Sequence, residues 1–68
     1  MSLSEQVAAN VRRVRVEAGL SQTDLTRRLG VSHGYVSAIE RGRKNLTLQS
    51  VERLAEALGV DPADLLRG

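Results

Sequence analysis

The chain is short, slightly basic and free of cysteine. Its 68 residues carry ten Lys or Arg against eight Asp or Glu, for a formal net charge of +2, and a single histidine. This composition excludes disulfides and any thiolate or multi-histidine metal site, and no apolar run reaches the roughly 18–20 residues of a membrane span. We therefore expect one domain (1–68), without a signal peptide, in the cytoplasm.

The first stretch of chain has helical spacing of its apolar residues, and we expect a helix over residues 4–18 that ends before Gly19. Residues 1–3 are expected to fray. The stripe that this helix would bury consists of Leu3, Val7, Val11, Val14 and Ala18.

The next segment begins with the tetrapeptide SQTD, which is a capping box. The Ser21 side chain can accept from backbone N–H groups while Asp24 reaches back to the Ser21 backbone. Gly30 follows at the position where a left-handed residue stops a helix. We therefore expect a short helix over residues 21–29.

A second short helix is expected over residues 32–41. Ser32 would cap it, Val36 and Ile39 would face inward, and Gly42 would end it. Two short helices joined by a turn of three to four residues containing Gly are typical of the helix-turn-helix, which inserts its second helix into the major groove of DNA. The segment 21–42 therefore predicts a DNA-binding protein.

One pattern begins four of the expected helices: an apolar residue, a capping residue, three variable positions and another apolar residue. It predicts a hydrophobic staple at each start, and it adds helices over 47–58 and 61–67, the last ending at Gly68. No segment alternates with the period of a strand. The fold class is therefore all-α, a compact five-helix bundle. The four staples pair Leu20 with Leu25, Val31 with Val36, Leu46 with Val51, and Val60 with Leu65.

The outward side of the helix over 32–41 supplies the candidate base-reading residues. A helix in the major groove reads bases mainly with residues near its N-terminus, and an Arg on it can reach guanine with two hydrogen bonds. An uninvolved surface imidazole is the alternative for the histidine among them. The candidates are His33, Gly34, Ser37, Ala38 and Arg41.

Contacts to DNA phosphates have separate candidates. Gln22 begins a helix, where free N–H groups favour an anion, and the others flank the candidate recognition helix. Tyr35 has the alternative of covering the core, which is compatible with presenting its hydroxyl. Basic residues cluster at three places in the chain, and solvated surface is the alternative interpretation of each cluster. The clusters are Arg12, Arg13 and Arg15, then Arg27 and Arg28, and then Arg41, Arg43 and Lys44. The candidates are Gln22, Tyr35, Arg43, Lys44 and Asn45.

The segments RRVRVEAGLSQTDL, LGVS, YVSAIERG and LAEALGV, in this order, resemble the Cro/C1-type (XRE-like) helix-turn-helix family over nearly the whole chain. The resemblance implies a lambda-repressor-like fold. Within that family, IERGRKNLTLQSVE looks most like the controller proteins of restriction–modification systems, which bind paired half-sites as dimers. The chain differs from them in having His33-Gly34 where a longer donor such as Arg is frequent.

The resemblance carries several roles over to this chain. Gln22 matches a phosphate-contacting Gln, and His33, Gly34 and Ser37 match base-reading positions, while Tyr35, Lys44 and Asn45 match backbone-contacting ones. Arg15 and Glu40 match an ion pair between the first helix and the end of the third, which would fix the orientation of the recognition helix. Two unrelated surface charges are the alternative for that pair.

A homodimer is expected because one small domain reads too few base pairs to be specific, and paired half-sites double its contacts. Leu65 and Leu66 are adjacent, and adjacent residues on a helix cannot face the same way, so one of them exceeds what the internal core needs and can belong to an interface. The alternative is that this leucine only covers the edge of the core. The expected interface consists of Leu48, Val60, Leu65 and Leu66.

The function that the sequence predicts is therefore a sequence-specific, dimeric transcription regulator of double-stranded DNA, in the cytoplasm and on the nucleoid when bound. An antitoxin or adaptor of the same fold, which mainly binds a protein, is the alternative. No enzyme activity, cofactor, metal or small-molecule ligand is expected, because no nucleophile–base pair, carboxylate dyad, phosphate-binding loop or metal constellation can be recognised.

Overall fold

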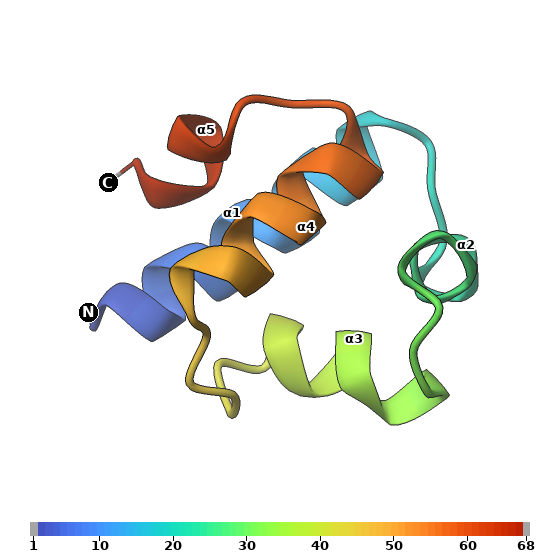
Figure 1. The fold of residues 1–68 in the computed structure, drawn as a ribbon, viewed down its shortest axis with the longest axis horizontal. Coiled ribbons are helices and arrows are strands. Elements are labelled where there is room, and N and C mark those ends of the chain that lie inside the picture. The colour runs from blue at the N-terminus through green and yellow to red at the C-terminus, as the bar shows by residue number, and fades with distance from the viewer. Residues whose placement is uncertain (1, 68) are drawn as a thin grey trace.

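The computed structural model describes residues 2–67, which form five helices and no strand (Figure 1). The all-α prediction is confirmed, with each boundary within about one residue of the expected one. The expectations for Met1 and Gly68 lie outside the described residues. The helices are α1 (Leu3–Glu17), α2 (Gln22–Leu29), α3 (His33–Glu40), α4 (Leu48–Leu58) and α5 (Pro62–Leu66).

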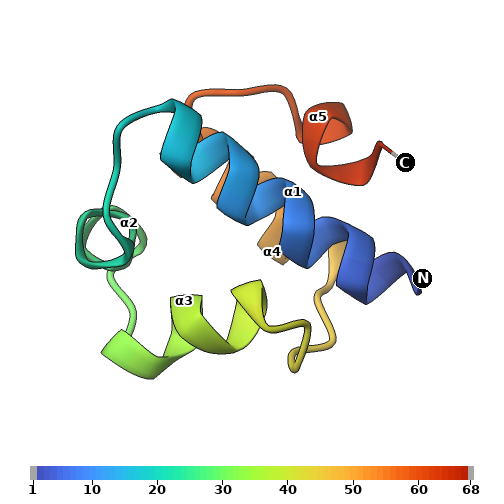
Figure 2. The same cartoon turned by 180° about the vertical axis from the view of Figure 1, so that it is seen from behind.

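The helices α1 and α4 lie side by side in the middle of the molecule, with α4 in front in Figure 1 and α1 in front in Figure 2. The short helix α5 packs on both of them at one edge. At the opposite edge α3 packs on α1 and on α2, and α2 also contacts α4. The recognition-helix candidate α3 is therefore held on the rim of the bundle.

All four predicted hydrophobic staples are present. The residue before each cap is half-buried against the core, and its partner four positions after the cap is at most 4% exposed. Each staple fixes the angle at which the chain enters the helix. The half-buried members are Leu20, Val31, Leu46 and Val60, and the buried members are Leu25, Val36, Val51 and Leu65.

The start of α2 has the predicted capping box. The Asp24 backbone N–H donates to Ser21 Oγ over 3.0 Å, and the Ser21 backbone N–H donates to Asp24 Oδ2 over 2.9 Å. The hydrogen bond from the Ser21 backbone lowers the pKa of Asp24 below its ordinary value of 3.8. The helix ends at Gly30, whose φ of +68° is the left-handed conformation that Gly adopts at least cost.

Two details of capping differ from the expectation. Ser32 occupies the N-cap position of α3, but its side chain makes no capping hydrogen bond, so only the position was predicted correctly. A capping box between Ser2 and Glu5, which was not predicted, starts α1 one residue earlier than expected. The hydrogen bond from the Ser2 backbone lowers the pKa of Glu5.

The core-facing stripe of α1 is also corrected at both ends. Val7, Val11 and Val14 are buried as expected, whereas Leu3 is 62% exposed and Ala18 lies exposed just after the helix. Leu3 is the first residue of α1, where the neighbouring helices no longer cover this stripe on all sides. Ala8 takes part in the core in its place, at 4% exposure.

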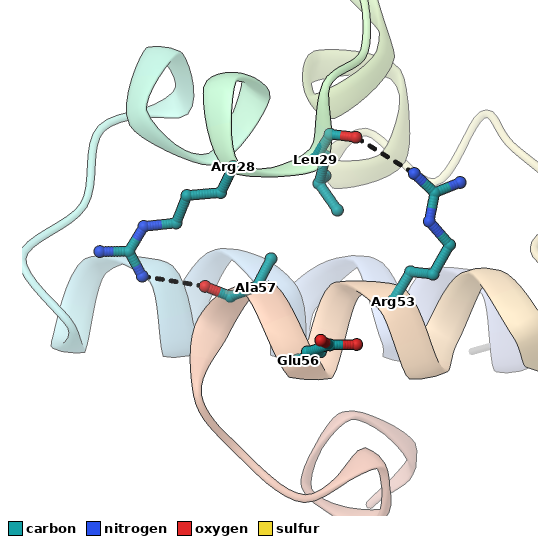
Figure 3. A pocket seen from close by; sticks show the side chains of 5 residues that line it. All are labelled: Arg28, Leu29, Arg53, Glu56 and Ala57. Atoms are coloured by element: carbon teal, nitrogen blue, oxygen red, sulfur yellow. Dashed lines mark hydrogen bonds between the residues drawn. The ribbon is translucent and has the colours of Figure 1, made fainter.

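Two arginines brace α2 against α4 (Figure 3). An Arg28 guanidinium N–H donates to the Ala57 carbonyl over 3.0 Å, and an Arg53 guanidinium N–H donates to the Leu29 carbonyl over 3.1 Å. Both carbonyls lie in the last turn of a helix, where they lack an intrahelical partner and where positive charge is favoured. These two hydrogen bonds hold α2 against α4, so that Leu25 and Leu29 of α2 stay buried.

Thr26 is the one buried polar side chain in residues 2–67 whose oxygen finds no hydrogen-bond partner there. We expect Thr26→Val, which keeps the shape and removes the hydroxyl, to stabilise the fold by about 1 kcal/mol. In thermal unfolding this corresponds to a rise in Tm of roughly 4–8 °C for a domain of this size. Thr23→Val, at an exposed site of the same helix, is the control and should give no comparable rise. A lower Tm for Thr26→Val would show that the hydroxyl contributes to stability.

Candidate nucleic-acid interface

The outward face of α3 follows from what the helix buries. Val36 is 0% exposed and Ile39 is 1% exposed, so both point into the core as expected. His33, Gly34 and Arg41 are consequently exposed. The helix therefore presents the imidazole of His33 and the bare backbone of Gly34 at its start, and the guanidinium of Arg41 follows directly after its end.

Ser37 and Ala38, the two remaining candidates on this helix, are half-buried. They lie between the buried Val36 and Ile39 in the sequence, so they occupy the flanks of the exposed face and not its crest. The side chains at these two positions are small. The face can therefore approach another surface closely at its middle turn.

One carboxylate ties three helices together beneath this face. Glu40, the last residue of α3, accepts at Oε2 from Arg15 Nε of α1 over 2.7 Å, and at Oε1 from a second Arg15 nitrogen over 3.1 Å. Oε1 also accepts from the Gln22 side-chain amide, at the first residue of α2, over 3.1 Å. Gln22 keeps one amide N–H free of this network, and its side chain is exposed.

The ion pair between Arg15 and Glu40 is largely removed from water, with side chains 12% and 4% exposed. A third Arg15 nitrogen donates to the Leu20 carbonyl in the turn between α1 and α2 over 2.8 Å. The hydrogen bonds to Glu40 raise the pKa of the Arg15 guanidinium above its ordinary value. The pair is therefore a bidentate, hydrogen-bonded contact that fixes the end of α3 relative to α1.

The segment after α3 carries the second group of candidates. Gly42, with a φ of +71°, turns the chain in the left-handed conformation that Gly adopts at least cost, and a Cβ there would be in ordinary contact with Glu5 of α1. Arg43, Lys44 and Asn45 are exposed beyond this turn. Tyr35 packs half-buried against the core, and Lys44 Nζ lies 4.9 Å from the centre of its ring. This cation–π contact holds the ammonium beside the start of α3.

A shallow apolar groove of about 70 Å³ lies between the start of α1 and α4 and the end of α5. Three leucines stand exposed around it: Leu48 at 75%, Leu3 at 62% and Leu66 at 37%. Its lining residues are Leu3, Ser4, Val7, Leu46, Leu48, Val51 and Leu66.

The structure removes one residue from the predicted dimer interface and sets a second apart from the remaining two, Leu48 and Leu66. Leu65 is 0% exposed inside the core of the monomer, so its assignment to an interface is wrong. Val60 is half-buried against the same core and lines a different hollow between α1 and α5. Both side chains complete the staple of α5, which is the role that their spacing also predicted. Leu3 also stands exposed at the apolar groove, although the helical stripe had assigned it to the core.

No helix within residues 2–67 is long and apolar enough to cross a membrane. The same residues bring together no group of three His, Cys, Asp or Glu side chains that could hold a metal ion.

The sequence matches a family model described as helix-turn-helix over residues 11–65, which include α2, α3 and α4 completely. The chain therefore belongs to the helix-turn-helix family, and its relatives are transcriptional regulators. An HTH-type transcriptional regulator of Sinorhizobium fredii, y4dJ, is 41% identical over 66 residues, which cover 97% of this chain and 86% of that protein.

Two further similar proteins are named as a control protein and as a restriction–modification controller protein. Control protein C.BamHI of Bacillus amyloliquefaciens is 40% identical over 57 residues, covering 82% of this chain and 70% of that protein. The controller protein C.Esp1396I, solved as a tetramer in complex with its natural 35 base-pair operator, superposes with a TM-score of 0.86 at 31% identity. That match covers 96% of this chain and 86% of the other.

The buried ion pair makes a direct prediction for stability. Glu40→Ala leaves the guanidinium of Arg15 unpaired where it is 12% exposed, and should lower the free energy of unfolding by about 3–5 kcal/mol. Glu17→Ala, which removes an exposed ion pair with Arg13, should cost less than about 1 kcal/mol. Replacing both Arg15 and Glu40 by Met should recover much of the loss. Urea unfolding measures all three variants, and equal losses for Glu40→Ala and Glu17→Ala would contradict the assignment.

Proposed function

We propose that this protein is a sequence-specific DNA-binding transcription regulator, which acts as a homodimer on paired half-sites and is of the restriction–modification controller type. The observation that carries the proposal is the orientation of α3, whose apolar residues Val36 and Ile39 are buried while its polar face lies open at the rim of the bundle. A helix presented in this way fits a major groove about 12 Å wide.

The residues of α3 receive base-reading roles according to their chemistry. Arg41 reaches a guanine with two donors, His33 donates to guanine N7 or O6, and Ser37 donates or accepts. Ala38 offers a methyl group to the methyl of thymine. Gly34 leaves room for the groove floor at the start of the helix, where, apart from the adjoining residues and backbone of α3 itself, no atom of residues 2–67 lies within 4 Å of the position that a Cβ would take.

The phosphate contacts flank this helix on both sides. On one side Gln22 is oriented by Glu40 and offers its second amide N–H at the start of α2. On the other side lie Tyr35, Arg43, Lys44 and Asn45, with Lys44 held over the tyrosine ring. The ion pair of Arg15 and Glu40 sets the tilt of α3 between the two flanks.

We place the dimer interface on the apolar groove and assign it to Leu3, Leu48 and Leu66, the three exposed leucines around it. Exposed leucines gathered at one site favour burial against a second copy of the chain, because each side chain gains about 1.5–3 kcal/mol on full burial. An isologous contact of this kind relates two recognition helices by a two-fold axis, as paired half-sites require.

The proposal includes a single domain over residues 1–68 that works in the cytoplasm without catalytic activity, cofactor or small-molecule ligand.

The salt dependence of DNA affinity distinguishes this proposal from a protein-binding adaptor of the same fold. DNA affinity should fall by about 0.9 log unit per log unit of salt for each phosphate neutralised, whereas an adaptor shows no such dependence on DNA.

Ser37→Glu tests the DNA-binding face. A carboxylate on the flank of α3 meets the negative groove wall, so operator binding should be abolished while the far-UV CD spectrum stays helical. The operator is first selected from random duplexes with the wild-type protein. Ala63→Glu adds the same charge on α5, at the opposite edge of the bundle, and should bind nearly as tightly as wild type. Retained binding by Ser37→Glu would refute the proposed face.

Leu48→Lys tests the dimer interface. Losing one apolar contact from each copy should raise the dimer dissociation constant by at least about 100-fold, because two partly buried leucines are worth roughly 3 kcal/mol together. Val16→Lys, at a 58% exposed site of α1 outside the groove, should leave it unchanged. Sedimentation equilibrium measures both variants. A Leu48→Lys protein that dimerises like wild type would move the interface elsewhere.

A further inference from the structure

A polar hollow of about 280 Å³ lies where α1, α2 and α3 meet, the three helices that Figure 2 shows around one side of the molecule. It is lined by Arg12, Arg15, Gln22, Ser37, Glu40 and Arg41. Five of these residues already have a place in the ion-pair network or in the proposed DNA contacts. Arg12, on α1, is the member to which neither the ion pair nor any proposed contact assigns a role.

The charges around the hollow favour an anion. Three guanidinium groups line it against one carboxylate, and that carboxylate is 4% exposed and accepts from Arg15 and Gln22. All three nitrogens of the Arg15 guanidinium are themselves engaged, with Glu40 or with the Leu20 carbonyl. The positive charge that remains accessible at the rim therefore belongs to Arg12 and Arg41, both of which are exposed.

The neighbouring arginine on α1 behaves differently. Arg13 donates to Glu17 Oε1 over 3.2 Å and to Asn10 Oδ1 over 3.5 Å, and it lines the hollow between α1 and α5. Within residues 2–67 no hydrogen bond or ion pair engages the Arg12 side chain. Both arginines line a further hollow along α1, with Ala9, Val16 and Glu17. Of the two, Arg12 also lines the polar hollow beside α3, and Arg13 does not.

We propose that Arg12 is a DNA-backbone contact made by α1, which binds a phosphate of the strand that runs beside α3. This inference rests on the proposed function. Ser37 and Arg41 line the hollow and also belong to the face that enters the groove, so the wall of that groove passes directly over the hollow. Arg12 from α1 and Gln22 from α2 then hold the same stretch of backbone from two helices.

The test compares Arg12→Ala, Arg12→Lys and Arg13→Ala in a fluorescence-anisotropy titration of the selected operator and of an unrelated duplex, from 0.1 to 1 M salt. Arg12→Ala should weaken both duplexes alike, by about tenfold at 0.1 M salt, and lower the salt slope by about 0.9 because one phosphate is no longer neutralised. Arg12→Lys should restore the slope. Arg13→Ala, which changes the net charge equally, should stay within about twofold of wild type.

Each outcome of this comparison either supports or overturns the phosphate contact proposed for Arg12. Equal behaviour of Arg12→Ala and Arg13→Ala, whether both weaken or neither does, overturns the proposal, since general charge or solvated surface would then account for Arg12. A loss confined to one base pair of the operator also overturns it, because Arg12 would then read a base. If the wild-type protein binds neither duplex in a salt-dependent way, the proposed DNA-binding function itself is overturned. If the wild-type protein binds normally and Arg12→Ala binds equally well, only the role of Arg12 is overturned. Far-UV CD of all variants should match wild type.

Discussion

The burial of Val36 and Ile39 is the constraint on which the rest of the structure depends. These two side chains, at most 1% exposed, lock α3 against α1 and α2 in one rotational setting. Since residues on a helix lie about 100° apart, this setting alone decides that His33, Gly34 and Arg41 face outward. Every functional role proposed for α3 follows from it.

Apolar packing accounts for the rotation of α3, and a polar network adds contacts at its last residue. The Glu40 carboxylate joins the end of α3 to α1 through Arg15 and to the start of α2 through Gln22. On the far side of α2, Arg28 and Arg53 tie it to α4 (Figure 3). These contacts use arginine where a bidentate or helix-end geometry is needed, which is consistent with nine of the ten basic residues being Arg.

The sequence alone predicted the helices closely, because local signals agree with the tertiary fold at each helix start. The staple from Val31 to Val36 and the stop at Gly30 together define the turn, and both are properties of neighbouring residues. The inward side of α3 was predicted for the same reason. The pairing of Arg15 with Glu40, 25 positions apart, came from family resemblance, since no local rule joins residues at that distance.

What the sequence could not supply was the extent of neighbouring helices. The apolar stripe on α1 includes Leu3, but only the structure shows that the other helices leave Leu3, the first residue of α1, exposed. Adjacent Leu65 and Leu66 must face different ways, yet only packing decides that Leu65 is the buried one. The hydrogen bond from Gln22 to Glu40 depends on where α2 and α3 meet, which no local sequence pattern predicts. Gln22, which was expected to contact a phosphate, therefore also donates to a carboxylate that the sequence did not indicate as its partner.

The most direct test of this account is a titration of the ¹⁵N-labelled protein with its selected operator, followed by amide chemical shifts in two-dimensional NMR. The account predicts that the largest changes map to Gln22, Ser37 and Arg41, with the amides of Val60 and Ala63 near α5 almost unmoved. Changes centred on α5 and the adjoining end of α1, with α3 unaffected, would contradict it.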